Sequence, residues 1–234
     1  MKPSRRLLAV SLLLLSAPFA ASAEDPPASS ASWEVSAVSD YLFRGVSQTD
    51  EKPTLQGEFT WTSAAGVYVG SFASGVDFGS GSPHAEVDYF VGYGHALGDS
   101  VALDVSINRY SYPGASELAY NELITKATFA DRYSATVGYS NDVWNSGSTG
   151  WYYAVGGEWA LPHDLALSAN VGRSVFADNV AVAAEDYTDW SVAVSKTMGV
   201  ATVSLGYYGT DGQGRASFGK LADDRVLLSV KIAR

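Results

Sequence analysis

The sequence contains no cysteine and only three histidines among its 234 residues. Without cysteine no disulfide can hold the fold together, so a large core or a closed hydrogen-bonded sheet has to do so. His84, His95 and His163 each adjoin an expected turn or loop, and no spacing joins two of them to a carboxylate as a zinc site requires. Neither a metal nor a cofactor is therefore expected.

Positive charge is also scarce. The chain has 15 basic residues against 25 acidic ones, a formal net charge of −10. Such a balance excludes nucleic acid as a partner, because phosphate backbones attract the opposite sign. Charged residues make up only 17% of the chain, whereas aromatic residues make up 12% and glycine occurs 23 times. This composition favours strands over helices.

The longest apolar run lies at the start of the chain, after a basic beginning, and closes on small residues around Ala23. This order predicts a secretory signal peptide at residues 1–23. A transmembrane anchor is the alternative, but Ser16 and Pro18 interrupt a run that is short of the roughly 18 residues a spanning helix needs. Removal of the peptide leaves 12 basic against 25 acidic residues, a net charge of −13. Residues 24–32 are expected to form a flexible leader, and residues 33–234 the folded domain.

Alternation of apolar and polar side chains dominates the rest of the chain. Val87, Tyr89 and Val91, for example, alternate with Glu86 and Asp88. Because successive side chains of a strand point to opposite faces, each such segment has one apolar and one polar face. About twelve segments share this pattern, and most are near the length that a tilted strand needs to cross a bilayer: 33–44, 54–62, 67–78, 85–95, 101–112, 120–130, 132–144, 151–160, 165–176, 187–196, 200–209 and 224–234.

The connections between these segments are short and long in turn, which is typical of outer-membrane barrels, with short turns in the periplasm and long loops outside. The sequence therefore predicts an all-β fold, an antiparallel transmembrane up-and-down β-barrel of about 12 strands. A soluble sandwich or lipocalin-like barrel is the alternative. The membrane is favoured because the polar faces are mostly Ser, Thr, Gly and Asn, and because aromatic residues gather near strand ends. We expect Trp33, Trp61, Tyr93, Phe129, Tyr133 and Trp159 at the periplasmic ends and Tyr41, Phe43, Tyr139, Trp151 and Tyr207 at the outer ends.

One segment carries a family resemblance. Residues 39–50 read Ser-Asp-Tyr-Leu-Phe-Arg-Gly-Val-Ser-Gln-Thr-Asp, and the chain continues with Pro53, Gln56-Gly57, Glu86-Val87-Asp88 and Tyr112-Pro113-Gly114. In these motifs and over most of its mature length the chain resembles the TorF-type porin family. The resemblance implies an outer-membrane barrel of Gram-negative bacteria, inserted by the barrel-assembly machinery. The chain departs from the aromatic ending common in outer-membrane strands, since it ends on Lys231-Ile232-Ala233-Arg234.

Catalytic motifs are sparse, and no enzyme activity is expected. The G-x-S-x-G motif of a nucleophile elbow is absent from the sequence. Asp40, Ser47 and His84 could supply a hydrolytic triad at one rim of the barrel, but a triad without a motif is recognised only by geometry. A histidine in a turn, such as His84, is more often an ordinary surface residue than a catalytic base.

Two functions remain open. One is a porin-like channel for the passive diffusion of small hydrophilic solutes, and the other is a closed barrel with a structural or recognition role at the surface. Small residues expected on the inward face favour the channel: Gly92, Gly94, Ser106, Gly138, Gly156, Gly172, Ser174 and Gly206. Large residues expected on the same face could narrow it: Tyr110, Tyr112, Tyr152, Phe176 and Tyr208.

The ionisable residues assigned to the polar faces suggest a modest cation preference, because acids outnumber bases in the expected lumen. The expected pore-lining residues are Asp40, Arg44, Glu58, Glu86, Asp88, Asp104, Glu122, Lys126, Glu158, Asp189, Arg225 and Lys231. Glu34, Asp77 and Lys196 are counted on the same faces.

Two arginines interrupt the apolar faces instead. Alternation places Arg109 and Arg173 toward the outer strand ends and facing lipid. There an arginine can reach the phosphates of lipopolysaccharide, so both are expected to contact it. A local bulge that turns them inward is the alternative reading.

Overall fold

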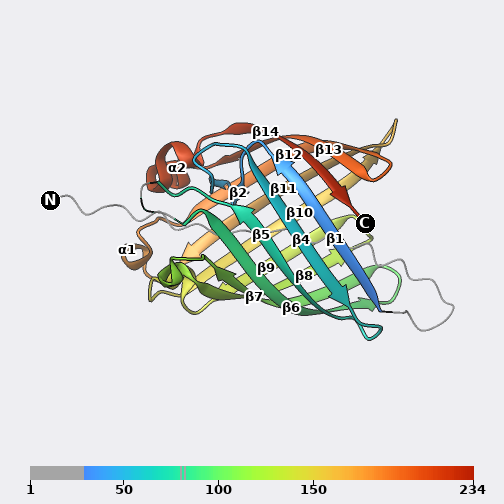
Figure 1. Ribbon diagram of the computed structural model, residues 1–234, viewed down its shortest axis with the longest axis horizontal. Coiled ribbons are helices and arrows are strands. Elements are labelled where there is room, and N and C mark those ends of the chain that lie inside the picture. Colours follow the sequence, from blue (N-terminus) through green and yellow to red (C-terminus); the bar gives the residue numbers. More distant parts are fainter. Residues whose placement is uncertain (1–28, 80, 82) are drawn as a thin grey trace.

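Alternating side chains produce strands along most of the chain, and in the computed structural model these strands close into a barrel (Figure 1). The structure describes residues 29–79, 81 and 83–234. The expected signal peptide at residues 1–23 and residues 24–28 of the expected leader lie outside the described residues. Ser30, Ala31 and Ser32 were expected to belong to that leader, but they form the start of the first strand.

Within the described residues, twelve strands form the barrel wall: β1 (Ser30–Val38), β4 (Thr54–Thr62), β5 (Val67–Gly75), β6 (Ala85–Leu97), β7 (Val101–Ser111), β8 (Tyr120–Phe129), β9 (Tyr133–Ser140), β10 (Gly150–Leu161), β11 (Leu165–Phe176), β12 (Tyr187–Met198), β13 (Ala201–Thr210) and β14 (Arg225–Ala233). Each strand pairs antiparallel with its neighbours in the chain, and β14 pairs with β1 to close the ring. The predicted antiparallel up-and-down barrel of twelve strands is confirmed.

The two ends of the barrel differ. Turns of two to four residues join the strands at the end where β1 begins and β14 finishes. Longer connections at the other end carry short helices: η1 (Ser116–Leu118), η2 (Val143–Asn145), α1 (Asn179–Val182), α2 (Gly212–Phe218) and η3 (Gly219–Ala222). In Figure 1, α1 and α2 lie at the opposite end from the C-terminus. By the usual arrangement of such barrels, the helix-bearing end is the outer end and the short turns are periplasmic. None of the helices in the described part of the chain is long and apolar enough to span a membrane.

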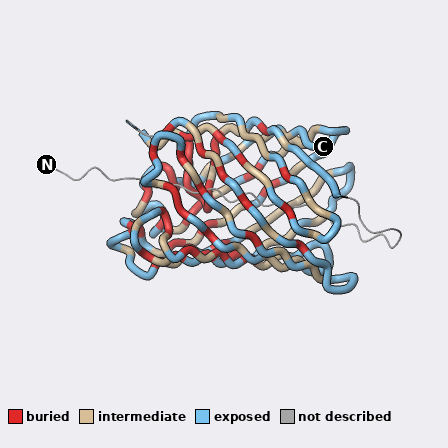
Figure 2. The backbone as a smooth tube through the Cα atoms, turned by 60° about the horizontal axis from the view of Figure 1, so that its bottom comes forward, coloured by how far each residue is buried: buried red, intermediate tan, exposed pale blue. Residues whose placement is uncertain are grey.

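The wall is apolar outside and polar inside. On β7, Leu103, Val105 and Ile107 face outward and are exposed, whereas Asp104 and Ser106 between them face the lumen. Figure 2 shows the same alternation of exposed and buried positions around the barrel. An apolar outer face and a polar inner face are what a barrel surrounded by lipid requires. The closed ring also has no open sheet edge, whose unpaired backbone groups lipid could not satisfy.

Aromatic residues stand at both rims of this apolar surface. Trp33, Trp61, Tyr93, Phe129 and Tyr133 are exposed toward the periplasmic ends, and Trp151 and Tyr207 toward the outer ends. Two residues expected in the outer girdle are not there. Tyr41 and Phe43 are buried inside the barrel, at 6% and 2% exposure.

The reason is that the chain leaves the wall after Val38, where the sequence predicted one continuous strand over 33–44. Two short strands, β2 (Leu42–Phe43) and β3 (Val46–Ser47), pair with each other instead of with the wall. Arg44 and Gly45 join them with φ of 46° and 79°. Two successive positive φ angles are the signature of a tight two-residue hairpin turn, which glycine favours at one of the two positions.

Candidate functional site

The segment between β1 and β4 folds into the barrel from its outer end. Residues 43–49 are all buried, and Gln48 has no exposed surface. We call residues 40–49 the plug hairpin. Such burial is explained by what surrounds it, because the hairpin contacts inward-facing side chains on both sides of the lumen.

On one side the hairpin contacts β5 and β6. The ring of Tyr41 packs edge to face against Phe72, with 6.0 Å between ring centroids. Its hydroxyl donates to Glu86 Oε1 at 2.7 Å. At the base of the hairpin, Gln48 accepts a backbone hydrogen bond from Asp77 in the following loop. This side therefore combines one aromatic contact with hydrogen bonds.

The tip of the hairpin reaches the opposite side. A Cβ on Gly45 would lie 2.6 Å from Thr210 Cγ2 on β13 and 3.1 Å from Asp189 Cβ on β12, so only glycine permits this approach. Because the hairpin touches β5 and β6 at one end and β12 and β13 at the other, it spans the width of the barrel. The outer part of the lumen is thereby filled.

Arg44, at the hairpin tip, forms a buried ion pair. Its Nη2 lies 2.6 Å from Glu122 Oε1 on β8, and both side chains are nearly inaccessible, at 4% and 2% exposure. Tyr110 donates a second hydrogen bond to Glu122, at 3.0 Å to Oε2. The guanidinium lies over two aromatic rings, 4.0 Å from the centroid of Tyr152 and 4.5 Å from that of Phe43. The ion pair and the cation–π contacts thus stabilise the charge where water is excluded, while Nε of Arg44 is buried without a hydrogen-bond partner among the described residues.

Gly138 on β9 makes room for this pair. A Cβ at this position would lie 2.8 Å from Glu122 Oε1 and 3.1 Å from Arg44 Nη2. The sequence suggested Gly138 as a small residue of an open lumen. In the structure the space it leaves is taken by the ion pair.

Asp40 holds the base of the hairpin. Its Oδ1 accepts hydrogen bonds from the hydroxyls of Ser47 and Thr49, each at 2.7 Å. Its Oδ2 lies 2.6 Å from Nη1 of Arg225, at the start of β14. The hairpin is therefore tied to the strand that closes the barrel.

A second group of ion pairs lies on the outer surface, just beyond the hairpin. Lys220 on η3 contacts Asp50 at 2.7 Å, and Lys52 contacts Asp77 at 2.8 Å and Asp50 at 3.3 Å. Hydrogen bonds from Lys220 and Lys52 hold the pKa of Asp50 below its usual range, and the hydrogen bond from Lys52 does the same for the pKa of Asp77. We call Asp50, Lys52, Asp77 and Lys220 the surface latch.

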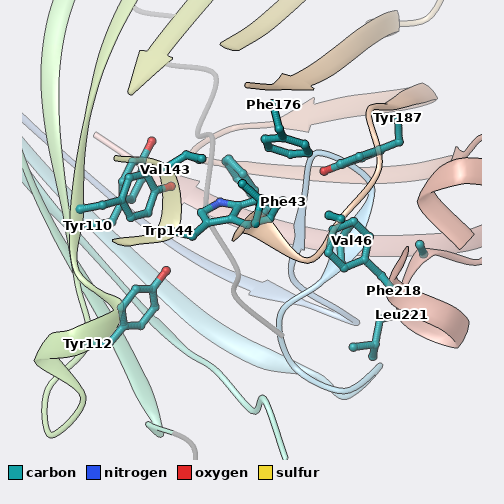
Figure 3. Close-up of a cluster of buried hydrophobic side chains, with 14 of the residues drawn as sticks. Phe43, Val46, Tyr110, Tyr112, Val143, Trp144, Phe176, Tyr187, Phe218 and Leu221 are labelled. Carbon is teal, nitrogen blue, oxygen red and sulfur yellow. The ribbon is translucent and has the colours of Figure 1, made fainter. Parts of the chain in front are cut away.

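Aromatic side chains from the long loops and strand ends complete the filling of the outer lumen (Figure 3). Trp144 packs against Phe176 and Phe218, with centroids 5.1 Å and 6.1 Å apart, and Tyr187 contacts the same Phe218 at 5.4 Å. The full cluster of buried residues is Phe43, Val46, Tyr110, Tyr112, Ala115, Tyr120, Val143, Trp144, Phe176, Val182, Ala184, Tyr187, Phe218, Leu221 and Ala222.

The periplasmic part of the lumen is more open. Glu34 on β1 lies directly opposite Glu58 on β4, and Lys231 on β14 pairs with Glu34 at 3.1 Å. The side chains of this pair keep 27% and 40% of their surface exposed. A shallow recess here is lined by Glu34, Ser36, Gln56, Gly57, Glu58 and Phe72. Water therefore reaches charged groups here that it does not reach at the outer end.

Most of the expected lumen residues do face inward. Strand alternation places Glu34, Glu58, Glu86, Asp88, Asp104, Glu122, Lys126, Glu158, Asp189, Arg225 and Lys231 on the inner face, and the plug hairpin brings in Asp40 and Arg44. Two assignments are wrong. Asp77 lies in the loop after β5, where it binds Lys52. Lys196 has the same parity as the outward Val192 and Val194, so it faces outward near the periplasmic end of β12.

Arg109 and Arg173 lie on the outward face, as alternation predicted, and no bulge turns them inward. Each is exposed and near the outer end of its strand. Arg109 donates to Asn121 at 3.4 Å, and Arg173 donates to Thr188 at 3.1 Å.

The residues considered for a hydrolytic triad are only partly brought together. Ser47 donates directly to Asp40, as described above, and no contact joins the exposed His84 side chain to either within the described ranges. No three His, Cys, Asp or Glu side chains of residues 29–79, 81 and 83–234 group as metal ligands.

Sequence reasoning missed the loop residues that fill the lumen. Three of these residues were expected in strands or loops with no part in filling the lumen, yet all three are buried in the cluster: Trp144, Val182 and Phe218. Large apolar residues in long outer loops are the signal that could have identified them, because such residues need cover.

Comparisons with known proteins agree with the fold. A family model described as "Bacterial protein of unknown function (Gcw_chp)" matches residues 20–233. The solved structure of the KdgM porin is similar at 8% identity and a TM-score of 0.53, covering 86% of this chain and 98% of that one. The NanC porin is similar at 10% identity and a TM-score of 0.53, covering 86% and 97%. At this identity the likeness concerns the outer-membrane barrel fold. No curated protein sequence matches the chain.

Proposed function

This chain belongs to the family of bacterial proteins of unknown function (Gcw_chp), and we propose that it is an outer-membrane channel for small hydrophilic solutes with a modest cation preference. A TorF-type porin identity, in a Gram-negative bacterium and with residues 1–23 as signal peptide, is part of this proposal. So is insertion by the barrel-assembly machinery.

The observation that carries the proposal is the contrast between the two parts of the lumen. At the periplasmic end, charged side chains such as Glu34 and Lys231 remain partly exposed to water. At the outer end, one local segment, the plug hairpin, accounts for much of the filling. A barrel that serves only as a scaffold has no need for charged side chains in its interior, because burying each of them costs desolvation free energy.

Conduction then requires the plug hairpin to move. Val38 and Thr54, the last paired residues before and after it, lie opposite each other on adjacent strands. Ser39 still donates a backbone hydrogen bond to Leu228 on β14, at 2.9 Å, and residues 40–53 leave and re-enter the wall at neighbouring positions. The hairpin can swing outward without breaking any pairing between wall strands, so opening costs only the contacts of the hairpin itself.

The cation preference follows from the inward charges. Acids outnumber bases on the inner face, even after Asp77 and Lys196 are removed from the count. An excess of negative charge within a low-dielectric wall raises the local concentration of cations. Arg44 opposes this effect at the outer end, where Glu86, Asp88, Glu122 and Asp189 face the lumen.

Planar-bilayer recording tests the proposal. We expect infrequent openings of the full-length barrel and sustained conductance from a variant in which residues 41–48 are replaced by a short Gly-Ser linker. Heat-modifiable migration on gels checks that both barrels are folded. A folded linker variant that conducts no ions would overturn the channel.

The second candidate is a closed outer-membrane barrel with a structural or recognition role at the surface. The complete burial of Gln48 and the near-complete burial of the Arg44–Glu122 pair favour it, because these contacts are those of a stable core. The same recordings separate the two candidates, because openings of the full-length barrel support the channel, whereas a closed scaffold stays silent with its plug hairpin in place.

A further inference from the structure

The outward face of the barrel carries two copies of one arrangement of side chains. On three adjacent strands, Tyr89, Arg109 and Asn121 lie side by side in register. Four strands further around the wall, Tyr153, Arg173 and Thr188 do the same. In each copy the central arginine is flanked by an exposed tyrosine on one side and donates to a polar side chain on the other.

Both arginines stand at the same height on the wall. Arg109 lies eight residues beyond Val101, the first residue of β7, and Arg173 lies eight residues beyond Leu165, the first of β11. Apolar outward residues fill the interval in both strands, for example Val105 and Val171. Each arginine therefore sits at the outer rim of the apolar surface, where lipid tails give way to headgroups.

The charge of these arginines is not balanced by the protein alone. Among the described residues, no carboxylate lies within ion-pair distance of Arg109. Arg173 has one distant partner, Asp211, at 3.8 Å. A charge on the lipid face costs about 2–4 kcal/mol at mid-membrane and less toward the interface, so an anion from the membrane would stabilise it.

We propose that the two arrangements bind phosphate groups of lipopolysaccharide in the outer leaflet. A guanidinium binds phosphate through two parallel hydrogen bonds, and the neighbouring amide or hydroxyl orients it for that contact. The flanking tyrosine offers an apolar ring to the acyl chains and a hydroxyl to the headgroup. The surface thus fits an amphipathic ligand whose anionic groups lie at the height of the two arginines. Arg109 has no acidic neighbour among the described residues, so we expect it to bind phosphate more tightly than Arg173, which lies 3.8 Å from Asp211.

The test compares wild-type barrel with R109Q, R173Q and the double variant. Each is refolded without lipopolysaccharide and titrated with lipopolysaccharide, following the temperature of heat-modifiable unfolding. The matched control is K196Q, because Lys196 is also an outward basic residue but lies at the periplasmic end. We expect roughly tenfold weaker binding in the double variant, equivalent to about 1.4 kcal/mol, and no change in K196Q.

Three outcomes decide the matter. Equal binding by wild type and double variant overturns the proposal, as does an equal loss in K196Q, which would indicate general attraction of charge. Lipopolysaccharide stripped of its lipid A phosphates separates the phosphate contact from acyl-chain contact. If the stripped lipid binds wild type as well as the intact one does, the arginines are not phosphate ligands. None of these readouts requires ion conduction, so the result stands or falls independently of the proposed channel.

Discussion

Arg44 and Glu122 are separated by 78 residues in the sequence and meet in the lumen with 2.6 Å between Nη2 and Oε1. The pair joins the tip of the plug hairpin to the far wall of the barrel. Because both side chains are buried, neither can exchange its partner for water when the other is removed. This contact therefore offers a direct measure of how firmly the hairpin is held.

R44M should destabilise the folded barrel by about 3–5 kcal/mol, since it leaves Glu122 buried without a counter-charge. R44M/E122L removes both charges and should recover most of that loss. Unfolding by urea in lipid vesicles measures both free energies. The control is K231Q, which breaks the half-exposed pair with Glu34 and should cost about 1 kcal/mol or less. A loss in R44M no larger than in K231Q would contradict the tight hold inferred for the hairpin.

The surface latch should depend on pH in a defined direction. The pKa values of Asp50 and Asp77 are lowered from 3.8, so their stabilising contribution is complete above that value and is lost as pH falls through the lower folded values. The pKa values of Lys52 and Lys220 are raised from 10.5, chiefly by the hydrogen bonds that they donate to Asp77 and Asp50 respectively. The stabilising contribution of these two lysines is therefore complete below 10.5 and is lost as pH rises through the higher folded values. The latch is therefore intact across the neutral range.

The contribution of the latch to holding the hairpin should accordingly be constant across the neutral range, and openings should become more frequent as pH falls below 3.8 toward the lower folded pKa values of Asp50 and Asp77. Bilayer recordings at a series of pH values measure this. K220Q, which lacks one arm of the latch, should open more often at neutral pH and respond less to acid. High salt should act in the same direction as acid, because these charges are exposed and screened. An unchanged opening frequency in K220Q would show that the latch does not hold the hairpin.

Cation preference should weaken when lumen acids are neutralised. E34Q/E58Q removes two opposed carboxylates at the periplasmic end and should shift the reversal potential across a dilute KCl gradient toward zero. E117Q is the control, because Glu117 is exposed on η1 outside the lumen. The linker variant that lacks Arg44 should be more cation-selective than wild type. Anion selectivity in wild type would falsify the assignment of these acids to the ion path.

Single cysteines test which end faces the cell exterior. V180C on α1 should react with a membrane-impermeant thiol reagent in intact cells, since Val180 is 90% exposed at the helix-bearing end. H163C in the turn between β10 and β11 should react only after the outer membrane is permeabilised. The opposite pattern would invert the topology. No native cysteine interferes with the labelling.

The barrel wall was predictable because its signal is local. Alternation within each segment is set by the geometry of a single strand, so the twelve strands emerge close to their observed bounds. The same signal does not say what covers an apolar face. Tyr41 and Phe43 continue the alternation of β1, which suggested that lipid covers them. Their rings are instead covered by other side chains inside the barrel, at 6% and 2% exposure. The turn at Arg44-Gly45 was the available hint that the strand ends.

The lumen contacts were less predictable for a related reason. The face that a charged side chain occupies follows from strict alternation along its strand. Lys196 was assigned to the same face as Asp189, but the two are seven residues apart on β12 and therefore lie on opposite faces. Which partner a charged side chain meets depends on register and shear around the whole ring. The approach of Arg44 to Glu122 requires the hairpin to fold inward and β8 to present Glu122 at the same depth, and neither condition is visible in a single segment.

The joint between β1 and β14 has a consequence for the order of assembly. It is paired over five residue positions, against seven to twelve between the other neighbouring wall strands. Ion pairs reinforce it at both ends, Glu34 with Lys231 and Asp40 with Arg225. We expect a ring whose first and last strands meet in its shortest ladder to close there last and to part there first. Because Asp40 also anchors the plug hairpin, we expect the hairpin to reach its final position only after the C-terminal strand has paired.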